Sequence, residues 1–168
     1  MLPVATVLPV ANIAMVEQKH VLANLLQYYL YDFSEFSDDQ ISRDGSFDYP
    51  YLDYYWQDPE RTPYLFYLDG KPVGFALVRV ETDPANGNKC TDLAEFFILR
   101  PYRRRGYGST LALSVWRCHP GTWKVRVLQT NKAAYLFWKQ VIGKFTAGDF
   151  LETTLSVQPF IEFEFESG

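Results

Sequence analysis

The chain has 168 residues, of which 48% are hydrophobic and 17% aromatic, and its formal net charge is −4 at pH 7. This composition excludes a disordered or fibrous protein and predicts a single domain, residues 1–168, with a sizeable core. The negative charge argues against nucleic-acid binding. Cys90 and Cys118 make no disulfide framework, and no apolar run approaches the ~20 residues of a membrane span. We therefore expect a cytoplasmic protein without a membrane partner.

The first half of the chain is predicted to hold three strands and a helix. A short edge strand is expected over 6–10, and apolar residues at helical spacing predict a helix over about 18–34. Two further strands, 64–68 and 72–81, are joined by the hairpin signal Asp69-Gly70. Gly74 inside the second of them indicates a close backbone approach or a bulge.

The segment from Tyr49 to Trp56 is dense in aromatic residues and is expected to form a short helix or turn. Its rings either fill one end of the core or form the wall of a binding cleft.

The second half begins with a strand over 93–99, which Pro101 ends. A helix follows Gly108 and is stopped by the sequence His119-Pro120-Gly121. An imperfect strand over 123–129, a helix that starts at Thr130-Asn131, and strands over 150–157 and 159–166 complete the chain. This order is neither a regular alternation of strands and helices nor all-β, so it predicts an α+β protein.

The turn between the 93–99 strand and the next helix is rich in arginine and glycine: Arg100, Arg103, Arg104 and Arg105 precede Gly106 and Gly108. Glycines at a helix N-terminus leave backbone N–H groups unpaired and converging, which together with the helix dipole makes an anion site. The stretch is neither a P-loop, which needs a hydroxyl residue after Gly-Lys, nor a dinucleotide fingerprint, whose third glycine is replaced here by Leu111. We predict a phosphate-binding turn; the arginines alone could equally be a solvated basic surface.

This turn resembles the pyrophosphate-binding motif of the GNAT superfamily of N-acetyltransferases, in the form Arg103-x-x-Gly106-x-Gly108 after a strand-Pro-Tyr approach. A second GNAT motif is matched by Asn131-x-x-Ala134-x-x-Phe137-Trp138. With the order of elements, the resemblance covers nearly the whole chain. It implies a three-layer GNAT fold, a mixed and largely antiparallel sheet of six to seven strands flanked by about four helices.

The resemblance also implies that acetyl-CoA is the acetyl donor. Its pantetheine arm would pair with the 93–99 strand and its pyrophosphate would lie on the amides of the turn. The residues implied to bind it are Phe97, Ile98, Leu99, Arg103, Arg104, Arg105, Gly106, Tyr107, Gly108, Ser109, Asn131 and Trp138. Asn131 fits the position of a helix N-cap just as well, and Trp138 can fill core instead of contacting the CoA arm.

The implied reaction is direct transfer of the acetyl group to an amine. An alkylammonium of pKa ~10.4 is almost fully protonated at neutral pH, so a base must take its proton. Glu95 and Asp92 lie on or beside the 93–99 strand and are the candidates, with Glu95 favoured. Alternatively, Asp92 caps a loop and Glu95 is paired with an arginine.

The chain departs from the family at Trp138, which stands where GNAT enzymes usually carry the tyrosine that protonates the leaving thiolate. Tyr135, one helical turn earlier, or an ordered water could substitute. General acid catalysis contributes typically ~10²–10⁴-fold, and a thiol of pKa ~8.5 leaves tolerably as thiolate, so the change does not exclude catalysis. It does motivate an alternative, a CoA- or acyl-CoA-binding module without transferase activity.

The remaining expectations concern metals and partners. His20 and His119 are interpreted as structural, and no cluster of ligands at metal-binding spacing occurs, so no metal is predicted. The acceptor is expected to be a small-molecule or peptide amine. Tyrosines and acidic residues between 28 and 58 would suit a cationic amine. The resemblance also implies a possible homodimer.

Overall fold

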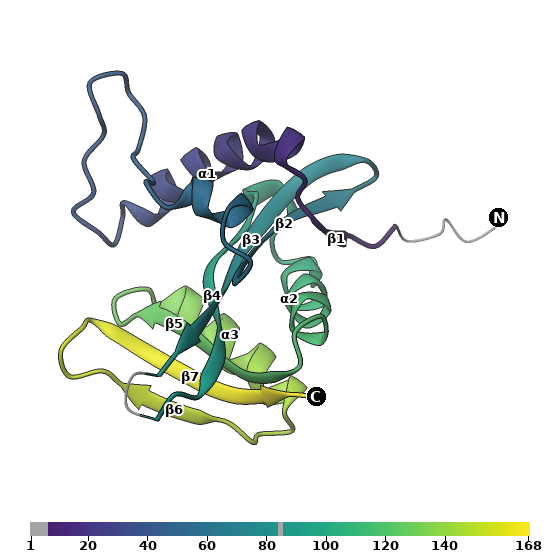
Figure 1. The fold of residues 1–168 in the computed structure, drawn as a ribbon, viewed down its shortest axis with the longest axis vertical. Helices are drawn as coiled ribbons and strands as arrows, with labels where there is room; N and C mark the ends of the chain where they lie inside the picture. Colours follow the sequence, from purple (N-terminus) through teal and green to yellow (C-terminus); the bar gives the residue numbers. More distant parts are fainter. Residues whose placement is uncertain (1–6, 84–85) are drawn as a thin grey trace.

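The computed structural model describes residues 7–83 and 86–168, which contain one seven-stranded sheet in the order β1-β2-β3-β4-β5-β7-β6 (Figure 1). Its strands are β1 (Val10–Ile13), β2 (Arg61–Leu68), β3 (Lys71–Thr82), β4 (Lys89–Ile98), β5 (Gly121–Leu128), β6 (Leu151–Thr154) and β7 (Phe160–Ser167). Neighbouring strands are antiparallel except β4 and β5, which are parallel. The predicted mixed, largely antiparallel α+β sheet is confirmed.

The helices are fewer than the expected four. The described ranges contain three α-helices, α1 (Lys19–Phe33), α2 (Tyr107–Arg117) and α3 (Lys132–Phe145), and three short 3₁₀ segments, η1 (Val16–Gln18), η2 (Leu52–Trp56) and η3 (Arg100–Tyr102). The count differs because the aromatic segment after α1 forms only the 3₁₀ turn η2, and two proline residues close behind it, Pro59 and Pro63, keep it from continuing as a helix.

The strand boundaries also differ at the sheet edge. The first strand was expected over 6–10, but β1 is Val10–Ile13; residue 6 lies outside the described residues, and 7–9 are not strand. Pro9 has no N–H to donate, so pairing with β2 begins after it. β2 begins at Arg61, earlier than expected, because Pro63 is accommodated with its carbonyl oxygen accepting from the Ala14 N–H at 2.8 Å.

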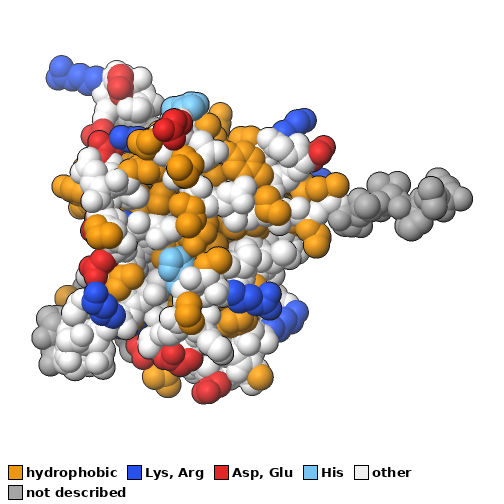
Figure 2. Space-filling model, turned by 45° about the vertical axis from the view of Figure 1, so that its right-hand side comes forward, with side chains coloured by type: hydrophobic (Ala, Val, Ile, Leu, Met, Phe, Trp, Pro, Cys, Tyr) orange, Lys and Arg blue, Asp and Glu red, His pale blue; other side chains and the backbone are white. Residues whose placement is uncertain are grey.

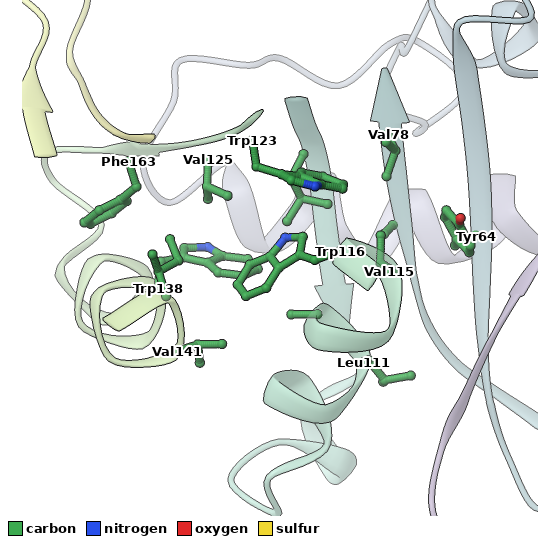
Figure 3. Packing of buried hydrophobic residues seen from close by; sticks show 14 of the residues in the cluster. Tyr64, Val78, Leu111, Val115, Trp116, Trp123, Val125, Trp138, Val141 and Phe163 are labelled. Atoms are coloured by element: carbon green, nitrogen blue, oxygen red, sulfur yellow. The ribbon is translucent and has the colours of Figure 1, made fainter. Parts of the chain in front are cut away.

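Two hydrophobic layers cover the two faces of the sheet. On one face, α2 and α3 pack over a core in which Trp116, Trp123 and Trp138 meet (Figure 3). On the other face, α1 and η2 pack against β2, β3 and β4, with Leu22 and Phe75 fully buried. The three-layer arrangement therefore follows from apolar residues on both faces of the central strands.

Gly74 lies at a close approach of two strands, as its position predicted. A Cβ atom at Gly74 would be 2.1 Å from the carbonyl oxygen of Phe97 on β4, and the β2–β3 register shifts between Phe66 and Tyr67, opposite it. Only glycine fits here.

The sheet opens between β4 and β5. The two strands pair only at Thr91 with Trp123 and at Asp92 with Lys124, and then they separate. The two halves of the sheet diverge from this point, as Figure 1 shows: one consists of β1, β2, β3 and β4, and the other of β5, β7 and β6. A parallel pair joined for two residues leaves most of the facing edge of β4 without a partner strand.

The molecular surface carries several exposed hydrophobic side chains near the edge strand β1. Val7, Leu8, Val10, Ile13, Met15 and Val16 are each 51–62% exposed. Figure 2 shows hydrophobic side chains gathered over much of one face. Among the helices that the structure describes, none is long and apolar enough to cross a membrane.

Candidate functional site

A cavity of about 580 Å³ occupies the gap where β4 and β5 separate. Its walls come from residues 93–96 of β4, 125–128 of β5, the C-terminal half of α1, the following loop, and the start of α3. It is therefore lined from both faces of the sheet.

Glu95 reaches this cavity because of a β-bulge in β4. Leu77 of β3 faces Glu95 while the next residue, Val78, faces Leu93, so Ala94 is an extra residue in β4. Side chains alternate along a strand, and one inserted residue reverses that alternation. The bulge thus brings Glu95 to the same face of the sheet as Asp92.

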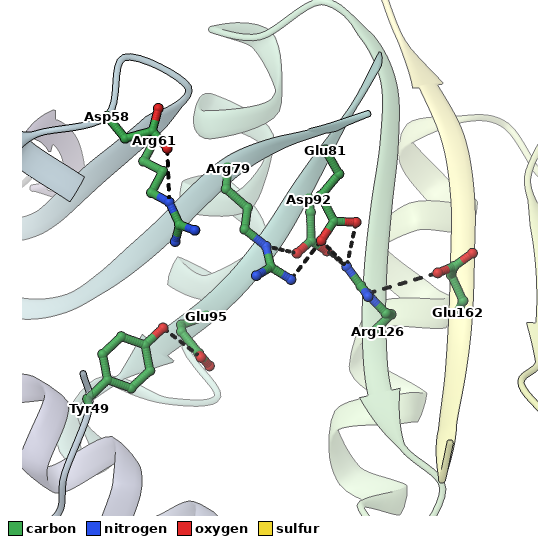
Figure 4. Close-up of polar contacts among 9 residues, drawn as sticks. All are labelled: Tyr49, Asp58, Arg61, Arg79, Glu81, Asp92, Glu95, Arg126 and Glu162. Atoms are coloured by element: carbon green, nitrogen blue, oxygen red, sulfur yellow. Dashed lines mark hydrogen bonds and ion pairs between the residues drawn. The ribbon is translucent and has the colours of Figure 1, made fainter. Parts of the chain in front are cut away.

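The carboxylate of Glu95 is held by two tyrosines. Tyr29 of α1 donates to Oε2 at 2.5 Å, and Tyr49 of the loop after α1 donates to Oε1 at 3.0 Å; Figure 4 shows the second contact. Burial raises the pKa of the Glu95 carboxyl to about 7, against the opposing effect of the two hydrogen bonds. A carboxyl with this pKa can change its protonation state near neutral pH.

Asp92, the other candidate base, is fixed in an ion-pair network instead. Its side chain is 2% exposed; Arg79 donates to one oxygen at 2.8 Å and Arg126 to the other at 2.9 Å (Figure 4). Both arginines also pair with Glu81. Asp92 therefore does not cap a loop but is paired with two arginines, and Glu95, the favoured candidate base, has no arginine or lysine within ion-pairing distance in the described ranges.

The loop between α1 and η2 closes one side of the cavity. Gln27 of α1 holds it through two hydrogen bonds to the backbone of Phe47, at 2.8 and 2.9 Å. This places Tyr49 and Tyr51 in the cavity wall, while Tyr55 of η2 is 2% exposed in the core. Tyr55 thus fills the core, whereas Tyr49 and Tyr51 line the cavity; that this wall borders a binding site stays a prediction.

The arginine-rich turn presents a row of backbone N–H groups. Thr110 is the first amide to bond back, to the Gly106 carbonyl at 3.2 Å, and amides 105–109 have no backbone acceptor in the part of the chain that the structure describes. Gly106 has φ +78° and Arg104 has φ +60°, so both adopt the left-handed conformation. A Cβ atom at Gly108 would lie 3.1 Å from the Phe137 ring, so this glycine lets α2 pack against α3.

The arginines of the turn divide into two pairs. Arg100 and Arg103 each donate to Asp32 of α1 at 2.6 Å, and Arg103 also donates to the Ile98 carbonyl. Arg104 and Arg105 are exposed and have no ion-pair partner among residues 7–83 and 86–168. Arg103, the first residue of the motif, is therefore occupied in holding the turn to α1, and the free positive charge lies at Arg104 and Arg105.

The open edge of β4 offers main-chain groups to the cleft. The Leu99 N–H bonds to the Val73 carbonyl on β3 at 2.9 Å, and the N–H groups of a strand point alternately to its two sides. The N–H groups of Phe96 and Ile98 therefore face the open side, while the side chains of Phe97 and Ile98 are buried.

Of the three predicted site residues at the start of α3 or on it, Asn131 and Trp138 line the cavity and Tyr135 does not. Asn131 caps the helix by accepting from the Ala134 N–H at 3.0 Å, and it also lines the cavity. Trp138 is 7% exposed, packs on Phe96 and lines the same cavity. Tyr135 is not brought to the cavity: its hydroxyl donates to Glu152 at 2.8 Å and accepts from Lys139.

Sequence reasoning missed the two tyrosines that hold Glu95. Tyr29 is 66 residues away in the chain, and on the predicted helix it belongs to the apolar stripe. The network of Arg79, Glu81 and Arg126 was missed as well, because each residue reads as an exposed strand position. His20 and His119 bond to the Glu17 carbonyl and the Tyr64 hydroxyl and lie outside the cavity lining. No group of side chains that could hold a metal occurs in the described ranges.

Comparison with known families gives one match. The model of the acetyltransferase (GNAT) family matches residues 26–143, a span that includes the cavity walls on α1, β4, β5 and α3. A comparison with curated protein sequences finds no match.

Solved structures share the fold at low identity. An acetyltransferase from Thermus thermophilus is 15% identical with a TM-score of 0.68, covering 95% of this chain and 97% of that one. Naa50 from Arabidopsis thaliana, solved in complex with the bisubstrate analogue CoA-Ac-MVNAL, is 15% identical (TM-score 0.60; 94% and 98% covered). The PaiA N-acetyltransferase from Thermoplasma acidophilum, in complex with coenzyme A, is 10% identical (TM-score 0.65; 94% and 98% covered).

Proposed function

The chain belongs to the GNAT acetyltransferase family, and on that premise we propose that its β4–β5 cleft moves an acetyl group from acetyl-CoA directly to an amine. The observation that carries the proposal is the cleft itself. It joins an open strand edge and a helix N-terminus, which suit the donor, to a buried carboxyl of pKa about 7, which suits an amine acceptor.

The donor site is supported by the chemistry of the exposed main chain. Unpaired amides at residues 105–109 and the positive end of α2 would receive the pyrophosphate, with Arg104 and Arg105 adding charge. The free edge of β4 around Phe96 to Ile98 would pair with the pantetheine arm, and Asn131 and Trp138 would border it. The two solved complexes described above, one with coenzyme A and one with a CoA-containing bisubstrate analogue, share this fold.

Glu95 would act as the general base. It takes a proton from the incoming ammonium, and the neutral nitrogen then attacks the thioester carbonyl carbon. The N–C bond forms, the C–S bond breaks, and the second nitrogen proton leaves to the CoA thiolate or to solvent. The Phe96 N–H, on the open edge beside the bulge, would polarise the thioester oxygen.

No acid side chain is needed in this scheme for the leaving thiolate. Trp138 cannot supply a proton, and Tyr135 is engaged with Glu152 and Lys139 outside the cavity lining. A thiol of pKa ~8.5 leaves as the thiolate with a modest penalty.

Two measurements test the proposal together. Calorimetry should detect acetyl-CoA binding at micromolar concentrations, and a thiol-detection assay should show CoA release when acetyl-CoA is mixed with small-molecule and peptide amines. Binding without release from any amine would instead indicate the alternative, a CoA-binding module. Absence of binding would reject both.

A further inference from the structure

The charge of the cavity lining is not balanced. Four carboxylates line it, against two guanidiniums, Arg79 and Arg126. Each guanidinium is already shared between Asp92 and Glu81. No positive charge remains in the lining for an acidic substrate.

The other three carboxylates, Glu95, Asp39 and Asp48, have no cationic partner within the described ranges. Asp39 accepts only from the Ser37 hydroxyl at 2.7 Å, and Asp48 from the Ser42 hydroxyl at 3.2 Å. Glu95 accepts hydrogen bonds from the neutral side chains of Tyr29 and Tyr49. The cavity lining therefore carries unmatched negative charge at two places: at the buried Glu95, and at Asp39 and Asp48 on the exposed loop after α1.

Much of the rest of the cavity wall is aromatic. Tyr29, Phe33, Phe47, Tyr49 and Tyr51 all line the cavity. Aromatic ring faces attract cations, most strongly where water is excluded, while they offer nothing to an anion.

We propose that the acceptor is a small amine with two positive charges, whose reacting nitrogen lies at Glu95 and whose second cationic group lies at Asp39 and Asp48. This inference rests on the proposed function and narrows its acceptor class. A diamine matches the unmatched negative charge at Glu95 and at Asp39 and Asp48, and its cationic groups suit the aromatic residues that line the same cavity. An amine that bears a carboxylate would place its negative charge against Asp39 and Asp48.

The test compares α,ω-alkanediamines of increasing length with butylamine and 4-aminobutanoate. Binding is measured by calorimetry on the complex with CoA, and turnover by CoA release. The variant is the double change Asp39→Asn and Asp48→Asn. Its control is Asp38→Asn with Asp44→Asn, which removes the same charge from the same loop at two residues outside the cavity lining.

A diamine should bind more tightly than butylamine, and 4-aminobutanoate more weakly. The cavity double variant should weaken diamine binding about 5- to 30-fold, as expected for two partly exposed charge pairs. It should weaken butylamine binding by a clearly smaller factor, because butylamine has no second charge for Asp39 and Asp48, and the control variant should match wild type for both ligands. Added salt should reduce the diamine preference.

Equal binding of diamine and butylamine, or equal losses in the two double variants, overturns the inference while leaving acetyl transfer intact. Diamine binding that depends on Asp39 and Asp48, with no CoA release from any amine, supports the acceptor site and rejects the transferase function. The two failures are therefore distinguishable.

Discussion

Glu95 combines burial, two hydrogen bonds and the absence of an ion-pair partner in the described residues, and this combination sets its chemistry. The carboxyl sits beside a cleft, and its pKa of about 7 matches the task of accepting a proton near neutral pH. The tyrosines oppose this elevation, because hydrogen bonds donated to a carboxylate favour its charged form.

Tyr49→Phe should therefore raise the pKa of Glu95. The rising limb of kcat/KM against pH should move to higher pH, and at pH 7 kcat/KM should fall about threefold to tenfold, the equivalent of one lost hydrogen bond. Tyr51→Phe is the matched control, since Tyr51 also lines the cavity but makes no hydrogen bond to Glu95. Equal pH profiles for the two variants would contradict a tuning role for Tyr49.

The same carboxyl should cost stability at alkaline pH. Its pKa in the folded protein, about 7, lies above the unfolded value of ~4.3, so the folded state binds this proton more tightly. The free energy of unfolding therefore falls, through this group, as pH rises from ~4.3 to ~7.

Glu95→Gln should then be more stable than wild type at pH 8, by about 1–3 kcal/mol, and the gain should shrink toward pH 5. Urea unfolding at the two pH values measures it, with Glu35→Gln, an exposed glutamate, as control. A Glu95→Gln effect of the same size at both pH values would show that burial does not destabilise the charged form of the carboxyl.

At the scale of elements, the turn from Arg103 to Gly106 is part of the proposed donor site. Gly106→Ala places a Cβ residue at φ +78°, which costs roughly 1–2 kcal/mol and should shift the amides of the turn. The dissociation constant of acetyl-CoA should rise about 5- to 30-fold. Gly45→Ala is the matched control, because Gly45 has φ +83° in the loop after α1. If both variants bound acetyl-CoA like wild type, the pyrophosphate would lie elsewhere.

The β4–β5 junction is the other element that sets the cleft. Asp92 ties Arg79 of β3 to Arg126 of β5 at the point where β4 and β5 part. Asp92→Asn leaves two arginines without their buried counter-charge and should lower the free energy of unfolding by about 3 kcal/mol. Glu164→Gln, which removes a carboxylate 3.6 Å from Lys124 at the exposed rim, should cost under ~1 kcal/mol. Similar losses would mean that the network does not hold the junction.

At the scale of the whole molecule, the fold was largely predictable from the sequence. Helical periodicity located α1 and α3, and Asp69-Gly70 and Gly74 marked the β2–β3 hairpin and its close approach to β4. The turn motif predicted a phosphate site at a helix N-terminus; the helix was expected after Gly108, and α2 begins at Tyr107. Each of these signals is local: it lies within one short stretch of the chain and can be recognised without knowledge of the fold.

The interior of the candidate site was less predictable because it is assembled from distant segments. The bulge at Ala94, which turns Glu95 toward Tyr29 and Tyr49, depends on β3–β4 register and leaves no mark in the residues of β4 themselves. Likewise, Tyr135 lies on α3, as does Trp138 of the cavity wall. Its position one turn earlier directs its hydroxyl to Glu152 and not to the cavity.

We propose that Glu95 takes the acceptor's proton in the β4–β5 cleft, and the decisive experiment is the pH dependence of CoA release by wild type and Glu95→Gln. With the best acceptor from the amine series, wild-type kcat/KM should rise through a pKa near 7. Glu95→Gln should lose that rise and fall about 10²–10⁴-fold at pH 8, with acetyl-CoA binding unchanged. A Glu95→Gln protein whose kcat/KM stayed within a few-fold of wild type across this pH range would show that Glu95 is not the general base.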